Sequence, residues 1–323
     1  MAGSRAFATV LHGDGAHACG AAVLSANLHA LEPTVPITVV ASSIGRGTRA
    51  ILESTGTLRV QHARPMPHAL AKDRQYPAQK DELWALPYHK VLYFDIDHVP
   101  VVGDGTRRRL AALWELLPPH AELAAVTEGR QSANWPCFNS GMLLLRPSRQ
   151  TRQRLDSVHP LQRLACNTAL VAGTDQPKLN HVFARNWSRI RAHHWRLANS
   201  ARTPRDACEE AVKTRQLTER ADSFHFFSGR NGVSLPWRWG CEQCAARSQF
   251  CSVRGATLNA TARRTNEACP AAYVASHVAW WAAFARLPAL TQALCRDRMR
   301  ETDNNRRAEC RELTLDNIGR GRQ

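Results

Sequence analysis

Short apolar runs alternate with stretches of helical periodicity along the first half of the chain. The apolar runs are bounded by turn-forming residues, which is typical of buried strands. We therefore predict strands over residues 6–11, 36–40, 58–61 and 91–96. Between them, small and apolar residues recur at helical spacing, and we predict helices over residues 16–31, 48–54 and 79–86.

The alternation continues beyond residue 97 and fades after Pro236 and Trp237. We predict further strands over residues 122–126, 137–146 and 223–227, and helices over residues 106–117, 148–158 and 175–183. Such alternation indicates βαβ units, whose right-handed crossovers place helices on both faces of a parallel sheet. We expect an α/β domain over residues 1–240 and a cysteine-rich, partly helical extension over residues 241–323.

The predicted strand over residues 91–96 runs directly into the sequence Asp95-Ile96-Asp97. Carboxylates are rarely buried unless they are paired or bind a metal. Strand alternation would put both carboxylates on one side, at the sheet edge where open α/β sheets bind ligands. Oxygen ligands at that edge predict a magnesium or manganese site that also takes substrate phosphates. A helix-capping Asp beside a surface Asp is the alternative.

The chain is strongly basic, with 43 Lys and Arg against 27 Asp and Glu and a formal net charge of +16. Such an excess suits a polyanionic partner. The basic residues are mostly Arg, however, and they are spread along the whole sequence. We find no helix-turn-helix pattern, no zinc-finger spacing with paired His and no aromatic-basic RNA signature. We therefore expect a solvated arginine surface and no nucleic-acid partner.

The ten cysteines are unevenly placed. Six lie in the last quarter: Cys241, Cys244, Cys251, Cys269, Cys295 and Cys310. An even cluster suggests disulfides in an oxidising compartment, with a zinc site or unpaired thiols as alternatives. The cysteines and two glycosylation triplets favour a Golgi or secretory lumen if the thiols are bonded, and a cytoplasmic location otherwise.

The N-terminus shows no signal peptide, and no stretch is apolar enough for a transmembrane segment. Residues 271–285 come nearest, but His277 interrupts them and Arg286 follows. We expect an amphipathic helix there that docks on the domain, with an interfacial helix as the alternative.

Four sequence blocks, in this order, resemble the glycogenin-like family 8 of glycosyltransferases. They are Lys80 followed by VLYFDID, the FNSG block from Cys137 to Pro147, the DQ–LN block from Thr174 to Asn180, and His225-Phe-Phe-Ser-Gly229 leading to Pro236-Trp237. The resemblance implies a GT-A fold, which is a Rossmann-like open mixed sheet flanked by helices. It also implies transfer of a hexosyl or related sugar from a UDP-sugar to an acceptor hydroxyl, with retention of anomeric configuration. The acceptor (carbohydrate, protein, lipid or polyol) and the oligomeric state stay open.

The same resemblance implies roles for the residues in these blocks. Asp95, Asp97 and His225 would hold Mn²⁺, with Mg²⁺ as a possible substitute. Ile96 belongs to the same donor-binding block, and Gly229 would let backbone N–H groups approach a phosphate. The N-terminal strand would line the uracil pocket, and the FNSG block would bind sugar hydroxyls; these residues are Ala8, Thr9, Val10, Asn139, Ser140 and Gly141.

Three residues are candidates for catalysis. Lys80 would neutralise donor phosphate charge or touch the sugar, and Asp175 and Gln176 would face the transferred sugar. Asp175 would act as a nucleophile or as a stabiliser of an oxocarbenium-like state, whereas a same-face mechanism needs no protein nucleophile. Taken singly, these residues also fit a solvated lysine and a helix N-cap.

One position departs from the family pattern. The family usually has a Lys directly before the final Pro-Trp, and Leu235 stands there in this chain. Arg230 could replace it, because a guanidinium binds phosphate through two parallel hydrogen bonds. The departure motivates an alternative function, a catalytically weak nucleotide-sugar-binding or scaffold protein.

Overall fold

The structure is a computed structural model that describes residues 4–64, 78–96, 98–100, 102–115, 117, 122–127, 138–158, 175–183, 223–225 and 280–301. In chain order its elements are β1 (Arg5–His12), α1 (His17–Leu31), β2 (Ile37–Ser42), α2 (Arg46–Ser54), β3 (Leu58–His62), the 3₁₀ helix η1 (Ala78–Ala85), β4 (Lys90–Phe94), β5 (His98–Pro100), α4 (Asp104–Glu115), β6 (Leu123–Thr127), β7 (Phe138–Leu145), α5 (Arg149–Asp156), α6 (Asp175–Phe183) and β8 (Ser223–His225).

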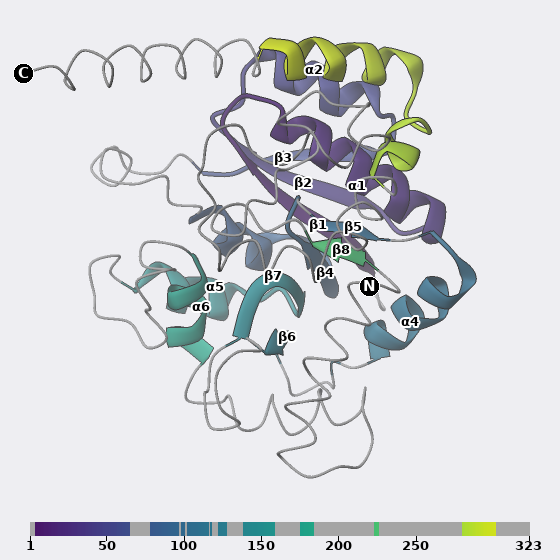
Figure 1. Cartoon of the computed structure of the whole chain (residues 1–323). Helices are drawn as coiled ribbons and strands as arrows, with labels where there is room; N and C mark the ends of the chain where they lie inside the picture. Colours follow the sequence, from purple (N-terminus) through teal and green to yellow (C-terminus); the bar gives the residue numbers. More distant parts are fainter. Residues whose placement is uncertain are drawn as a thin grey trace, which may run out of the picture.

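Six strands form one mixed sheet with the order β3-β2-β1-β4-β7-β6 (Figure 1). Strands β3, β2, β1 and β4 are parallel to one another, whereas β7 runs antiparallel to both β4 and β6. The predicted α/β fold with an open mixed sheet and flanking helices is confirmed. Because chain order reverses beside β1, this sheet has a switch point between β1 and β4, where open α/β sheets bind ligands.

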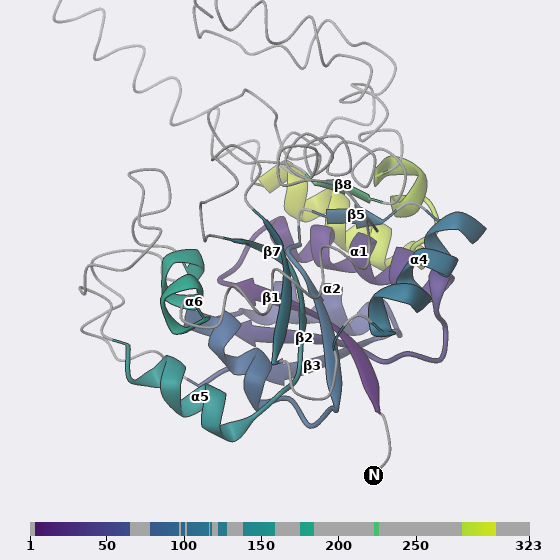
Figure 2. The same cartoon turned by 90° about the horizontal axis from the view of Figure 1, so that it is seen from below.

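Helices cover both faces of the sheet (Figure 2). On one face, side chains of β1 such as Phe7 and Leu11 pack against α1, α2 and α4. On the other face, Ala8, Val10 and Tyr93 pack against η1 and α6. Strand alternation thus buries β1 from both sides, as expected for parallel strands between helix layers.

Two helical stretches near the chain end, residues 280–284 and 289–301, lie on the first face. We refer to them as the C-terminal helical pair. They cover α1, whose small residues are buried along most of its length, as is typical of a helix with neighbours on all sides. The pattern predicts the first stretch as part of a docked helix over residues 271–285. The second stretch is not predicted.

Three further details differ from the sequence predictions. The segment over residues 79–86 is a 3₁₀ helix, and β4 ends at Phe94, before the first acid. A short antiparallel pair, β5 with β8, follows β4. The domain boundary predicted near residue 240 lies outside the described residues. No helix in the described ranges is both long and apolar enough to cross a membrane.

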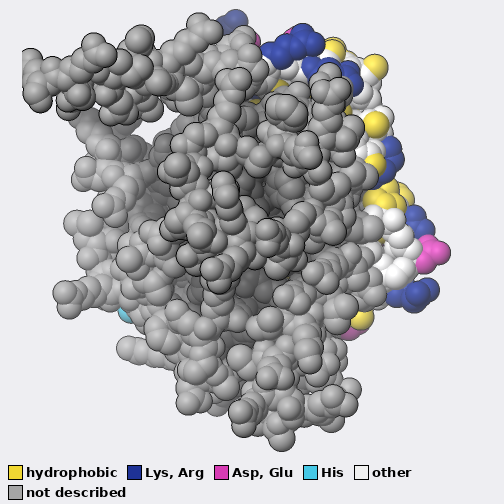
Figure 3. All heavy atoms as spheres, in the orientation of Figure 1, with side chains coloured by type: hydrophobic (Ala, Val, Ile, Leu, Met, Phe, Trp, Pro, Cys, Tyr) yellow, Lys and Arg dark blue, Asp and Glu magenta, His cyan; other side chains and the backbone are white. Residues whose placement is uncertain are grey.

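Charged side chains of both signs lie on the described surface. On the face drawn in Figure 3, Lys and Arg side chains occur along the described edge among acidic, hydrophobic and other groups. Several arginines are held in local ion pairs, including Arg298 with Glu301 and Arg300 with Asp297.

Candidate active site

Lys80 lies at the centre of the candidate site. It is buried on η1, and its Nζ atom lies 3.0 Å from Oδ1 of Asp95 and 2.6 Å from Oδ2 of Asp175. It also donates to the backbone carbonyl and the hydroxyl of Ser140, at 3.1 and 3.2 Å. One ammonium group therefore joins the end of β4, the beginning of β7 and the first turn of α6.

The charge of Lys80 is fixed by these neighbours. Burial alone would lower its pKa, but the carboxylates of Asp175 and Asp95 outweigh that effect and raise the pKa above the ordinary 10.5. An ammonium has three N–H donors, and four oxygen atoms already surround it. A donor phosphate would reach Lys80 only by displacing one of these oxygens.

Asp95 is held on one side and open on the other. Its Oδ1 atom accepts a hydrogen bond from the hydroxyl of Tyr93, whose ring centroid lies 5.1 Å from the Lys80 ammonium. The backbone N–H of Asp95 donates to the carbonyl of Gly141 at 2.8 Å, which extends the β4–β7 pairing by one residue. Among the described residues Oδ2 takes part in no hydrogen bond or ion pair, and the side chain is 29% exposed. Asp95 therefore has one carboxylate oxygen without a polar partner in the described part of the chain, where a cation could bind.

Helix α6 is attached to β7 through two side-chain amides. Oε1 of Gln176 accepts from the backbone N–H of Ser140 at 3.1 Å. Asn180, one turn later, accepts from the N–H of Phe138 at 2.8 Å and donates to its carbonyl at 2.9 Å. The backbone of the FNSG block and the first turn of α6 are thus fixed to each other.

The predicted nucleotide residues of β1 lie in the interior of the sheet. Ala8 and Val10 face the same side as η1, whereas Thr9 faces α1. Ala8 pairs with Tyr93 across β1 and β4, so this strand runs beside the candidate site. Ile96 is partly buried and packs against the apolar cluster that includes residues of β1, α1 and the C-terminal helical pair.

Several predicted residues fall partly or wholly outside the description. Asp97, Gly229 and Arg230 lie outside the described residues. For Asn139 and His225 the backbone alone is described. The register of β5 with β8 sets His225 opposite His98, which lies three residues after Asp95.

The donor set is suited to a divalent cation. Carboxylate oxygens and one neutral imidazole are ordinary ligands of manganese. The Asp95 side chain is 29% exposed, and the β5–β8 register brings the backbone of His225 toward the same strand end. Among the described side chains alone, no cluster of three His, Cys, Asp or Glu residues is formed.

Some solved structures that resemble this chain are glycosyltransferases. An active-site mutant of LgtC is 18% identical, with 80% of this chain and 94% of that chain covered at a TM-score of 0.45. The galactosyltransferase LgtC with donor and acceptor sugar analogues is 16% identical, with 83% and 95% covered at 0.45. The mannosyltransferase PcManGT of Pyrobaculum calidifontis, in complex with GDP-Man and Mn²⁺, is 14% identical, with 87% and 86% covered at 0.32.

No protein-family model matches the chain. No curated protein matches it either. Because the TM-scores are below 0.5, these likenesses do not assign an activity to this chain. Any assignment must come from the residues of the chain itself.

Sequence reasoning grouped Lys80, Asp95, Ser140, Asp175 and Gln176 in one site, and the structure brings these five together. The sequence analysis gave no role to Tyr93 or to Asn180. Asn180 lies in the DQ–LN block, one helical turn after Gln176, and this spacing was the available signal. Tyr93 lies two residues before Asp95, which places both on one side of an extended chain.

Proposed function

We propose that this chain is a glycosyltransferase that moves a sugar from a UDP-sugar to an acceptor hydroxyl, with retention of anomeric configuration and with Mn²⁺ as cofactor. The observation that carries the proposal is the buried Lys80 ammonium, which joins Asp95, Ser140 and Asp175 from three separate segments. These segments meet beside the switch point of the sheet, where a bound substrate is expected.

The proposal assigns the metal to Asp95, Asp97 and His225. The partly exposed carboxylate of Asp95 and the position of the His225 backbone support this assignment. A divalent cation supplies Lewis-acid stabilisation of the negative charge that develops on the leaving diphosphate. Mg²⁺ could take the same oxygen ligands.

Protein groups supply the remaining chemistry. Lys80 holds a permanent positive charge between the proposed metal ligand and Asp175, and so it orients both carboxylates. Asp175 provides negative charge toward the sugar, either as nucleophile or as stabiliser of positive charge on the anomeric carbon. Gln176 and Ser140, already hydrogen-bonded to each other, offer groups for sugar hydroxyls.

A donor screen tests the proposal. UDP release from UDP-glucose, UDP-galactose, UDP-glucuronate and UDP-xylose is followed with Mn²⁺ and with EDTA. We expect release from at least one donor that requires Mn²⁺ and is lost in Asp95→Asn. In parallel, UDP and Mn²⁺ at about 100 times their dissociation constant should stabilise the wild type by about 2.7 kcal/mol and raise its melting temperature.

The outcomes separate the alternatives. UDP binding that depends on Mn²⁺, without release from any donor or acceptor tested, would favour a nucleotide-sugar-binding or scaffold protein. Absence of both binding and release would refute the proposed function.

A further inference from the structure

Two buried ion pairs of opposite polarity join η1 to α6. Lys80 of η1 pairs with Asp175 of α6, and the next residue, Asp81, pairs with Lys178 of α6. The four side chains are between 4% and 15% exposed. Asp175 and Lys178 are three residues apart, so they lie on one face of the helix. That face presents a negative and then a positive group to a segment that presents a positive and then a negative group.

Helix α5 contributes a further cation beside the pair of Asp81 and Lys178. Arg152 of α5 lies with its guanidinium 3.8 Å from Asp81 and 2.7 Å from Oε1 of Glu82. The residue after Lys80 is therefore held by cations from two helices. Burial raises the pKa of Asp81, and the ion pair with Lys178 opposes that rise.

A contribution to folding stability is a weak explanation for the presence of the Asp81–Lys178 pair. The attraction between two buried charges seldom exceeds the free energy that is lost when they are removed from water. Replacement of such a pair by apolar residues is therefore often neutral or stabilising. The opposite polarity of the two pairs does, however, determine the rotation and register in which α6 can pack on η1. Rotation or slippage of α6 that brought Lys178 beside Lys80 would place like charges together, without water to screen them.

We propose that Asp81 and Lys178 form a positioning pair for the candidate active site, which holds Asp175 and Gln176 in register with Lys80 and Ser140. This inference rests on the proposed function. Neither member of the pair is assigned a contact with substrate or metal. They act through the first turn of α6, where both sugar-facing candidates lie.

The test removes both charges at once. In Asp81→Leu/Lys178→Met the ion pair is replaced by apolar groups, so no buried charge is left without its partner. We expect UDP release from the active donor to fall by about 10- to 100-fold in kcat, because small misplacements of reacting groups have effects of that size. The dissociation constant for UDP with Mn²⁺ and the melting temperature should stay close to wild type. Lys178→Arg, which keeps the charge, should recover most of the lost kcat.

A matched control comes from a more exposed ion pair that involves α5. Glu122 and Arg154 pair with 40% exposure each, and both side chains also hydrogen-bond to Thr151 of α5. The control variant Glu122→Gln/Arg154→Met should keep wild-type kcat. It shows whether loss of any ion pair that involves α5 lowers turnover.

The results distinguish failure of the two proposals. An active wild type whose apolar double variant keeps its kcat would overturn the positioning role and leave the proposed function intact. Equal losses in kcat, nucleotide affinity and melting temperature would also overturn it, since they indicate a structural role. A wild type that neither binds UDP nor releases it would overturn both.

Discussion

A buried lysine between two carboxylates loses its hydration, and in this chain the oxygen atoms around Lys80 replace it. Among the described residues of the cluster, the one cation Lys80 pairs with two carboxylates, Asp95 and Asp175. A divalent cation at Asp95 would add positive charge at the side of the cluster that faces solvent. The two acids therefore have different environments, since the side chain of Asp95 is 29% exposed and that of Asp175 is 9% exposed. This difference favours a metal role for Asp95 and a role toward the sugar for Asp175.

The role of Asp175 can be tested by removing its charge while keeping its shape. In Asp175→Asn we expect UDP release to slow by about 10²–10³-fold, the usual effect of losing one electrostatic stabiliser from an active site. The affinity for UDP with Mn²⁺ should change little, because the proposed metal ligands are untouched. Single-turnover kinetics and calorimetric titration measure the two quantities. Wild-type turnover would contradict the role, and Asp104→Asn, an exposed acid on α4, is the control.

Asp14 gives a second prediction, which concerns pH. A backbone hydrogen bond from Gly45 at 2.5 Å, followed by a hydrogen bond from Thr48, lowers the pKa of Asp14 below the ordinary 3.8. Asp14 thus caps α2 from the neighbouring loop, since Gly45 has no side chain to do so. A carboxylate with a lowered folded-state pKa adds stability above the unfolded pKa and loses it as the pH falls through the folded value.

The wild type should therefore be more stable than Asp14→Asn at neutral pH, and the difference should shrink on acidification. Urea unfolding at pH 7 and at about pH 2–3 measures the free energy of unfolding of both proteins. A difference of equal size at both values would show that the charge of Asp14 contributes nothing.

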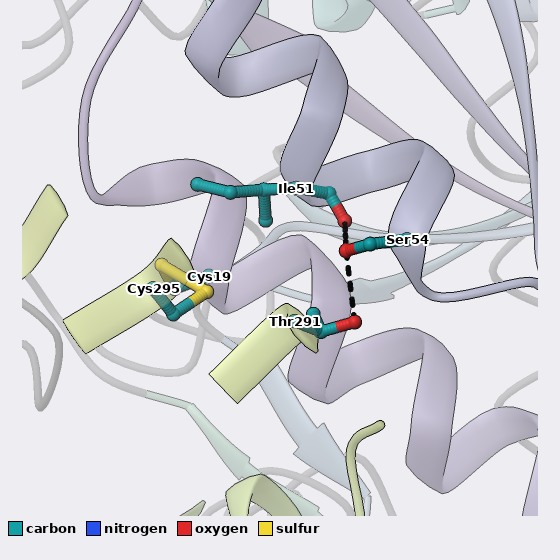
Figure 4. Close-up of a disulfide and its surroundings, with 5 residues drawn as sticks. All are labelled: Cys19, Ile51, Ser54, Thr291 and Cys295. Atoms are coloured by element: carbon teal, nitrogen blue, oxygen red, sulfur yellow. Dashed lines mark hydrogen bonds between the residues drawn. A yellow bond between two sulfur atoms is a disulfide. The ribbon is translucent and has the colours of Figure 1, made fainter. Parts of the chain in front are cut away.

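At the scale of elements, the C-terminal helical pair is fastened to α1 and α2 by several contacts. A disulfide joins Cys19 of α1 to Cys295, and the hydroxyls of Ser54 and Thr291 share a hydrogen bond of 2.8 Å (Figure 4). Arg286 also donates to the side chain of Asn27. Trp280 and Phe284 stack at 5.3 Å between ring centroids within the same apolar cluster.

Removal of this disulfide should destabilise the fold. Cross-links of this kind typically contribute about 2–4 kcal/mol, so Cys19→Ala/Cys295→Ala should melt on the order of 10 °C lower than the oxidised wild type. Dithiothreitol should lower the melting temperature of the wild type and have a smaller effect on the double variant, which reports the remaining cysteines. Equal melting temperatures without reductant would show that the thiols are not bonded in solution.

For the molecule as a whole, the sequence predicted the alternation of strands and helices because each element carries its own local signal. Hydrophobic periodicity located β1 to within a residue, and the break at Asn139-Ser140-Gly141 marked the start of β7. The meeting of Lys80 with Asp95 and Asp175 followed from the blocks that resemble a known family. These predictions depend on patterns within short segments.

Pairings between distant segments were beyond prediction. The cysteine cluster suggested disulfides without naming their partners, because connectivity has no local sequence signal, and Cys295 of that cluster bonds to Cys19. The type of helix at η1 was missed for a related reason. Lys80, Asp81 and Leu83 are all buried, so partners on several sides decide its geometry and no single apolar stripe reveals it.

The bond between Cys19 and Cys295 also has a consequence for biosynthesis. The two residues are 276 positions apart. At typical elongation rates the ribosome needs on the order of tens of seconds to make that length. During this interval the outer side of α1 has been synthesised but its covering helices have not, so a nascent chain shows an apolar surface that chaperones can bind. The same reasoning makes a product terminated before residue 280 prone to aggregation, even with the entire sheet in place.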